Sequence, residues 1–302
     1  MALNKTLVVV VGPTGIGKTA LAITIARKFH TQIISADSRQ FFKEMEIGTA
    51  KPSADELAAA PHHFINSHSI ENLFSTGDFE VQAIERIEQL FKEHDLLVMV
   101  GGSGLYIDAV CKGLDNLPET DLSIRAVLNT QLANEGIESI KKQLSEYDPE
   151  YYQKVDQANP QRMIRGLEFY LSTGTKLSSH LTSSKKIRPF DIIKIGLNMD
   201  RAELYRRINQ RVDKMIESGL VEEVKSLQHF RKHNALNTVG YSELFNYLDG
   251  ESTLKEAIDQ IKQNTRRFAK RQLTWFRRDD NTAWFEPGQD DVVISYISNK
   301  LT

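Results

Sequence analysis

The residues of this chain with the clearest chemical meaning form a complete phosphate-binding pattern, G-x-x-x-x-G-K-[ST]. They are Gly12, Pro13, Thr14, Gly15, Ile16, Gly17, Lys18 and Thr19. Gly15 and Gly17 let the backbone curl so that successive N–H groups point into one concavity. Lys18 adds a positive charge, and the Thr19 hydroxyl can bind a Mg²⁺ ion that accompanies the phosphates. The pattern therefore predicts a site for a di- or triphosphate.

What the site does to that phosphate depends on Asp37 and on Gly-Gly-Ser-Gly at residues 101–104. A carboxylate beside a phosphate loop can bind Mg²⁺, accept a proton from a nucleophile or cap a turn. The apolar segment at 96–100 is followed by Gly101 rather than an aspartate, so the Walker-B carboxylate of ordinary ATPases is missing there. This favours a group-transfer enzyme with Asp37 as general base. Ser103 can cap a tight turn or contact the reacting group.

Two segments have the charge expected of a surface that binds nucleic acid. Arg162 and Arg165 are three residues apart, on one face of a predicted helix. Residues 264–278 contain no acidic residue and six cations, which are Arg266, Arg267, Lys270, Arg271, Arg277 and Arg278. Like charges four residues apart mildly destabilise a helix unless an anion meets them, and RNA phosphate is such an anion. The alternative to RNA binding is that these cations only form a solvated helix face above an apolar contact with the core.

The elements that position these residues follow a strand–helix–strand order. Apolar segments at 7–11, 32–35 and 96–100 predict strands, and helices are predicted after the phosphate loop and at 81–93. Short loops between them imply parallel pairing, and ligands of such sheets bind beyond the carboxyl ends of the strands. The phosphate loop, Asp37 and Ser103 should therefore be neighbours in space.

The expected fold class is α/β: a P-loop NTPase-like parallel sheet with flanking helices and an inserted all-helical unit. The predicted parts are a first core segment at 1–116, the helical insertion at 117–189, and a core return strand with C-terminal helices at 190–302. The return strand is expected at 192–197. The later helices are expected at 201–230, 239–247 and 254–276.

Composition limits the remaining possibilities. The 302 residues are 40% hydrophobic and 26% charged, and the net charge is −2, so any basic surface must be local. Cys111 is the only cysteine, which excludes a disulfide or a cysteine-based zinc site within one chain. His62 and His63 lack a second ligand cluster, so a surface or packing role is favoured over metal binding. The run at 7–11 is too short to cross a membrane, and we expect a cytoplasmic protein, with a monomer favoured.

Seven motifs occur in an order that is typical of one family. They are Gly-Pro-Thr-x-x-Gly-Lys-Thr, Asp37-Ser38-Arg39-Gln40, Gly48-Thr49-Ala50-Lys51-Pro52, Gly101-Gly102-Ser103-Gly104-Leu105-Tyr106, Asn159-Pro160-Gln161-Arg162, Val239-Gly240-Tyr241 and Ala269-Lys270-Arg271-Gln272-Leu273-Thr274-Trp275. Over residues 7–287 the chain thereby resembles the bacterial-type tRNA dimethylallyltransferases, also called tRNA isopentenyltransferases. At Ser103 that family usually has threonine.

The resemblance implies transfer of a dimethylallyl group from dimethylallyl diphosphate to N6 of the adenosine just 3′ of the tRNA anticodon. Diphosphate leaves, and Mg²⁺ is the cofactor. It further implies that the phosphate loop and Arg211, or nearby Arg207, hold the diphosphate, that Asp37 is the general base, and that Lys18 and Ser103 belong to the catalytic set. Positions that match tRNA-contacting residues are Asp37, Ser38, Arg39, Gln40, Ser103, Arg125, Gln161, Arg162, Met163, Ile164 and Arg165.

Three other readings use the same phosphate loop. A small-molecule or nucleoside phosphoryl kinase would use Asp37 as base for a hydroxyl, but would leave the helical insertion and the basic segment unexplained. An adenylate prenyltransferase would act on a free nucleotide. A phosphate-loop RNA-binding regulator would carry out no transfer at all.

Overall fold

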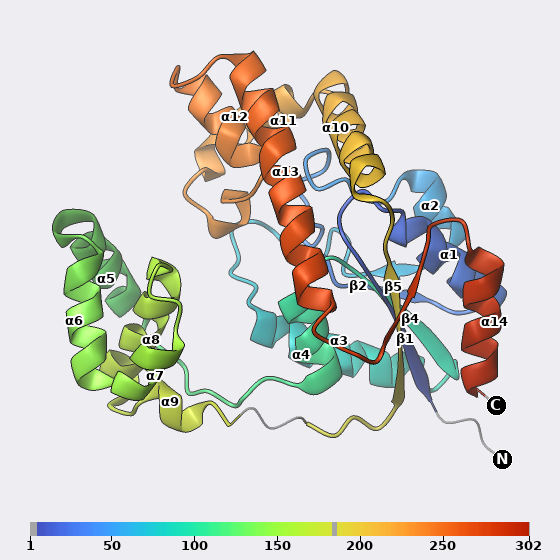
Figure 1. Cartoon of the computed structure of the whole chain (residues 1–302), viewed down its shortest axis with the longest axis horizontal. Coiled ribbons are helices and arrows are strands. Elements are labelled where there is room, and N and C mark those ends of the chain that lie inside the picture. Colours follow the sequence, from blue (N-terminus) through green and yellow to red (C-terminus); the bar gives the residue numbers. More distant parts are fainter. Residues whose placement is uncertain (1–4, 183–185, 302) are drawn as a thin grey trace. The chain divides into compact units, whose positions relative to one another are not determined.

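The computed structural model describes residues 5–182 and 186–301. It divides into two compact units, one made of residues 1–112 with 187–302 and the other of residues 113–186. Figure 1 shows the first unit as a sheet with helices around it and the second as a group of helices. Within the described residues, no helix is long and apolar enough to cross a membrane.

A six-stranded parallel sheet in the order β3-β2-β4-β1-β5-β6 forms the centre of the first unit. The strands are β1 (Thr6–Val11), β2 (Ile33–Ser35), β3 (His62–His63), β4 (Leu96–Val100), β5 (Asp191–Leu197) and β6 (Thr282–Phe285). Every residue of β1 is buried, because β4 and β5 flank it and helices cover both faces. This explains the continuous apolar run in its sequence.

Helices complete two apolar layers, one on each face of the sheet. The first unit contains the helices α1 (Lys18–Lys28), α2 (Ala54–Ala59), α3 (Thr76–Leu90), α4 (Gly104–Lys112), α10 (Arg201–Glu217), α11 (Leu220–Ser226), α12 (Tyr241–Leu248), α13 (Leu254–Phe276) and α14 (Asp290–Leu301). Val8 and Val10 of β1 pack with α1, α10 and α14, whereas Leu7 and Val9 pack with α3 and α4. The alternation is the period of two expected of a strand.

A third apolar cluster joins α10, α11, α12 and α13, which lie side by side in Figure 1. The single helix predicted at 201–230 is wrong in this region. Gly219 adopts a φ of +97°, which ends α10 after Glu217, and a new helix, α11, begins at Leu220. A short 3₁₀ turn, Gln228–Phe230, follows α11, and a second, Asn234–Leu236, precedes α12.

The second unit contains five helices within its described residues, and these are α5 (Leu122–Glu135), α6 (Ile137–Tyr147), α7 (Pro149–Lys154), α8 (Pro160–Thr173) and α9 (Leu177–His180). Asn159 caps α8 by accepting from the Arg162 N–H at 3.2 Å, and Gly174 ends the helix at a φ of +70°. Met163 and Ile164 are fully buried in the core of this unit.

The α/β fold class and the parallel sheet are confirmed. The short strands β3 and β6 were not predicted, whereas α13 has the predicted bounds. The lone cysteine, Cys111, lies in α4 with 7% of its surface exposed. Burial raises the pKa of its thiol to about 11.

Candidate active site

The phosphate loop connects β1 to α1 and has the curled backbone that its glycines predict. Gly15 and Gly17 have φ values of +78° and +106°, a region that residues with a Cβ rarely adopt. Gly17 caps α1 without a side chain, so the N–H groups of the first helical turn stay available to an anion. The Lys18 ammonium donates to the Pro13 carbonyl at 2.9 Å, which holds it over the loop.

The Lys18 ammonium is buried between an opposite and a like charge. Burial lowers the pKa of Lys18 to about 8; the Asp37 carboxylate opposes this shift and the Arg211 guanidinium adds to it. Burial also lowers the pKa of Arg211. Two cations held close together in a partly desolvated site attract a di- or triphosphate.

Two pockets meet at these residues. The smaller, of about 80 Å³, is lined by Lys18, Thr19, Ser35, Gln40, Ala50, Pro52, His62, Val100 and Gly101, besides shared residues. The larger, of about 380 Å³, has polar residues on one side and apolar and aromatic ones such as Tyr106, Val212 and Trp275 on the other. Both are lined by Thr14, Asp37, Arg211, Phe268 and Gln272. Asp37 therefore lies at the junction of a cationic pocket and a roomier, partly apolar one.

The ends of β2 and β4 are tied together beside Asp37. Ser103 accepts a hydrogen bond from the Ser38 backbone N–H at 3.0 Å and donates to the Ser38 hydroxyl at 3.1 Å. The Asp37 carboxylate accepts from the Arg39 N–H at 3.1 Å, which leaves its second oxygen without a hydrogen bond to that turn. Ser103 thus fixes the turn that carries Asp37, and both side chains line the larger pocket.

Gln272 is a site residue that sequence reasoning did not single out. It lies on α13, where its Oε1 accepts from the Thr14 N–H at 2.8 Å and its Nε2 donates to the Gly102 carbonyl at 2.9 Å. One buried amide therefore joins the phosphate loop to the turn that carries Ser103. A Cβ on Gly102 would lie 2.3 Å from this amide, which explains why residue 102 is a glycine.

His62 is partly buried and lines the smaller pocket. Its Nδ1 lies 2.8 Å from the Ala60 carbonyl, and its buried Nε2 has no hydrogen-bond partner among the described residues. Burial lowers the pKa of His62, although the Ala60 carbonyl opposes this. A neutral ring that donates through Nδ1 presents an acceptor at Nε2 to whatever fills the pocket.

The two arginines considered for the diphosphate have different surroundings. Arg211 lines both pockets, whereas Arg207 approaches the Ile16 carbonyl of the phosphate loop from α10 at 3.5 Å. Of the turn after Asp37, Ser38 and Arg39 line the larger pocket. The Gln40 amide is bound to the Thr49 and Ala50 carbonyls at 3.3 and 3.2 Å.

The helical unit holds the remaining predicted contacts. Arg125 and Arg165 both bind the buried Glu168 carboxylate, at 2.5 and 3.5 Å. Gln161 and Arg162 are exposed. Burial of Met163 and Ile164 excludes their side chains from contact with RNA, because they fill the core of the unit. Only part of the predicted stretch 161–165 is therefore available to a ligand.

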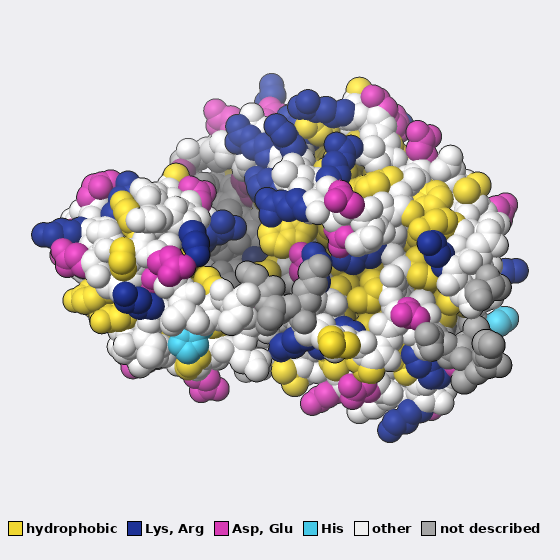
Figure 2. Space-filling model, turned by 60° about the horizontal axis from the view of Figure 1, so that its bottom comes forward, with side chains coloured by type: hydrophobic (Ala, Val, Ile, Leu, Met, Phe, Trp, Pro, Cys, Tyr) yellow, Lys and Arg dark blue, Asp and Glu magenta, His cyan; other side chains and the backbone are white. Residues whose placement is uncertain are grey.

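The basic segment forms the carboxyl half of α13 and the turn after it. Arg266 is bound to Asn209 at 2.7 Å, whereas Arg267, Lys270, Arg271, Arg277 and Arg278 are exposed. On the face drawn in Figure 2, Lys and Arg side chains gather around the upper centre. Arg271 also lines the larger pocket, with its guanidinium 5.8 Å from the Phe268 ring.

The fold and site define a P-loop protein of the group-transfer class, with a small cationic pocket beside the phosphate loop and a larger pocket that shares five of its lining residues. The family model described as IPP transferase matches residues 40–279. The chain belongs to this family, the tRNA dimethylallyltransferases. Membership makes it a prenyl-transferring enzyme and sets aside the kinase and the regulator without transfer chemistry.

Individual relatives cover nearly the whole chain. It is 53% identical over 300 residues to the tRNA dimethylallyltransferase of Christiangramia forsetii, with 99% of each chain covered. It is 48% identical over 292 residues to tRNA dimethylallyltransferase 1 of Bacteroides thetaiotaomicron, with 97% of this chain and 95% of the relative covered.

Solved structures agree with this relationship. The tRNA isopentenylpyrophosphate transferase of Bacillus halodurans is 37% identical, has a TM-score of 0.73, and matches over 98% of this chain and 97% of its own. A eukaryotic dimethylallyltransferase described as acting on tRNA has a TM-score of 0.78 at 25% identity, over 98% of this chain and 80% of its own.

Proposed function

We propose that this protein transfers the dimethylallyl group of dimethylallyl diphosphate to N6 of the adenosine just 3′ of the anticodon in tRNA. The observation that carries the proposal is the position of Asp37 at the junction of the two pockets. A base at this point faces the diphosphate side and the acceptor side at once. Relatives named for this reaction support the choice of substrates.

The smaller pocket suits the diphosphate. The loop N–H groups, Lys18 and Arg211 supply positive charge, and His62 becomes a donor once an adjacent anion favours its protonation. Among the described residues, no group of three His, Cys, Asp or Glu side chains could hold a metal ion. Mg²⁺ nevertheless fits, because it is usually held by few protein ligands together with substrate phosphates and water, and Thr19 offers the hydroxyl. When bound, Mg²⁺ would neutralise charge on the leaving diphosphate.

The transfer forms a bond from N6 to C1 of the dimethylallyl group and breaks the bond from C1 to the diphosphate oxygen. The N6 proton passes to the Asp37 carboxylate, and the bonding electrons of the broken bond leave with diphosphate. Lys18 and Arg211 stabilise the charge that builds on this leaving group. Because the two pockets share lining residues at Asp37, the amine and the allylic carbon can be held close together there.

The larger pocket suits an extruded base. Tyr106, Phe268 and Trp275 line it, and aromatic side chains are the usual stacking partners of unpaired bases. The adenosine must leave its stack to reach Asp37, which costs less in a single-stranded anticodon loop than in a duplex. Arg271 of α13 lines the pocket, and the exposed Arg267 and Lys270 of the same helix suit the tRNA backbone.

One labelling experiment tests the function. The enzyme is incubated with labelled dimethylallyl diphosphate, Mg²⁺ and one of three acceptors: tRNA, AMP or ATP. We expect label in tRNA alone, at the adenosine 3′ of the anticodon. Label in AMP or ATP instead would identify an adenylate prenyltransferase.

The pKa of Lys18 predicts a pH dependence. A lysine is cationic below its pKa, so above about pH 8 the free enzyme loses a charge that binds the diphosphate. We expect kcat/KM for dimethylallyl diphosphate to fall about tenfold per pH unit above this value, since kcat/KM reports groups of the free enzyme. The measurement is a profile from about pH 6.5 to about pH 9.5. A flat profile would show that Lys18 stays charged throughout.

The exposed cations of α13 predict a salt dependence of tRNA binding. We expect the double variant Lys270→Ala/Arg271→Ala to weaken binding and to reduce the slope of log K against log salt by roughly 0.7 to 0.9 per lost phosphate contact. Binding is measured at three salt concentrations for the wild type and the double variant. Lys232→Ala, an exposed lysine outside this segment, is the control. Parallel lines for the wild type and the double variant would place the RNA elsewhere.

A further inference from the structure

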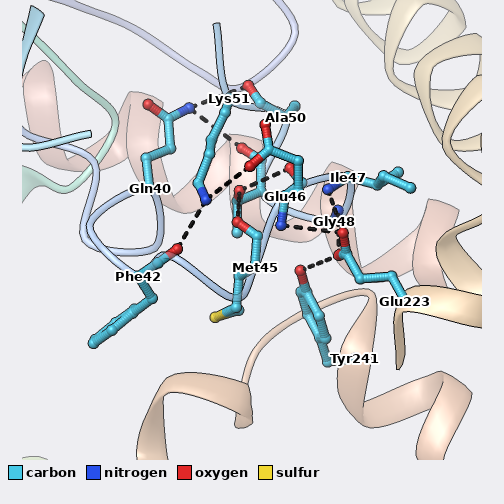
Figure 3. Close-up of polar contacts among 11 residues, drawn as sticks. Gln40, Phe42, Met45, Glu46, Ile47, Gly48, Ala50, Lys51, Glu223 and Tyr241 are labelled. Carbon is cyan, nitrogen blue, oxygen red and sulfur yellow. Dashed lines mark hydrogen bonds and ion pairs between the residues drawn. The ribbon is translucent and has the colours of Figure 1, made fainter. Parts of the chain in front are cut away.

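The Glu223 carboxylate, on α11, accepts four hydrogen bonds, three from the loop at 46–48 and one from Tyr241. Its Oε2 accepts from the backbone N–H groups of Glu46 and Ile47 at 3.1 and 2.6 Å. Its Oε1 accepts from the Gly48 N–H at 3.1 Å and from the Tyr241 hydroxyl at 2.6 Å. Figure 3 shows the carboxylate between the loop and the Tyr241 ring. A carboxylate suits this role because both oxygens only accept.

Tyr241, at the start of α12, holds the same loop through its ring. The side chain is fully buried, and a Cβ on Gly48 would lie 2.6 Å from it, so the loop backbone packs directly on the aromatic surface. Burial, with the nearby Glu223 charge, raises the pKa of the Tyr241 hydroxyl, which therefore remains a hydrogen-bond donor. Glu223 and Tyr241 together fix three successive peptide groups.

The far side of the loop reaches the reaction centre. The Thr49 and Ala50 carbonyls accept from the Gln40 amide, and the Gln40 N–H in turn donates to the Asp37 carbonyl at 3.1 Å. Gly48 and Thr49 line the larger pocket, whereas Ala50 lines the smaller one. The loop is thus a wall of both pockets, bonded on one side to the turn of Asp37 and on the other to Glu223.

We propose that Glu223 and Tyr241 are positioning residues for prenyl transfer, which hold the loop at 46–50 so that both pockets keep their shape at Asp37. This inference rests on the proposed function. Neither side chain is among the residues that line the two pockets. A displacement of about 1 Å at a reacting centre can cost about a hundredfold in rate, so the loss of such a support acts on turnover.

The test compares Glu223→Gln with Glu222→Gln, an exposed neighbour on the same helix. In Glu223→Gln an NH₂ group replaces one accepting oxygen and faces backbone donors. We expect its single-turnover rate at saturating substrates to fall about ten- to a hundredfold. We expect its tRNA dissociation constant to stay within about threefold of wild type and its salt slope to be unchanged. Glu222→Gln should match the wild type.

Tyr241→Phe is the second variant. It removes one of the four hydrogen bonds and keeps the ring beneath Gly48, so it should fold and show a smaller loss of rate in the same direction. A merely structural role predicts a lower melting temperature with a wild-type rate per folded molecule, and that result would overturn the proposal. If Glu223→Gln does not fold, the rate of Tyr241→Phe decides. Absence of tRNA labelling by the wild type would instead overturn the proposed function.

Discussion

Replacing Asp37 by Asn should lower the rate of prenyl transfer by about a hundredfold or more, the range for loss of a positioned general base. An amide cannot take the N6 proton at neutral pH, yet it keeps the shape of the carboxylate. Its Oδ1 can still accept from the Arg39 N–H, so the turn should persist. The measurement is a single-turnover rate with both substrates saturating, which separates chemistry from binding.

The control for this variant is Asp259→Asn, which removes an exposed carboxylate on α13 outside both pockets. It should match the wild type. The affinity of Asp37→Asn for tRNA should also change little, because phosphate contacts dominate RNA binding. A transfer rate within about threefold of wild type would remove Asp37 from the mechanism.

Replacing Lys18 by Ala should weaken binding of dimethylallyl diphosphate and slow transfer, by about a hundredfold in kcat/KM if the charge-assisted contact contributes about 3 kcal/mol. The physical reason is that Lys18 lies over the phosphate loop, where its charge meets the diphosphate in both the bound state and the transition state. Diphosphate binding and kcat/KM for each substrate measure the effect.

Lys28→Ala, an exposed change at the other end of α1, serves as the control for this variant. Both proteins should bind tRNA as the wild type does, because the proposed backbone contacts lie on α13. Loss of tRNA binding with normal diphosphate binding in Lys18→Ala would mean that the two sites are reversed.

The parts of the fold predicted well from sequence are those with long, local signals. The bounds of α13 match the prediction, and local signals mark this helix: Thr253 and Glu256 form a capping box before a long 3.6-residue periodicity. The strands β3 and β6 are two and four residues long, too short for a periodicity to be seen. The start of α3 at Thr76 was missed, although Ser75 and Asp78 form a capping box there.

The difference between residues with and without a local sequence signal also applies to the candidate active site. The phosphate loop, Asp37 and Ser103 lie in local motifs at strand ends, so a sequence is enough to propose them. Gln272 meets Thr14 across 258 residues of sequence, and Glu223 meets Ile47 across 176. No local pattern marks such pairs, since only the folded chain brings them together. The buried positions of Met163 and Ile164 likewise depend on which face of α8 packs inward.

The burial of Cys111 has a practical consequence. A thiol with a raised pKa that is nearly closed to solvent is a weak nucleophile, so maleimide and disulfide reagents should leave it intact at neutral pH. Because the chain has no other cysteine, a new one at any exposed position would be the single reactive thiol. Spin labels, fluorophores or cross-linkers can therefore be attached through one introduced cysteine, without first replacing Cys111.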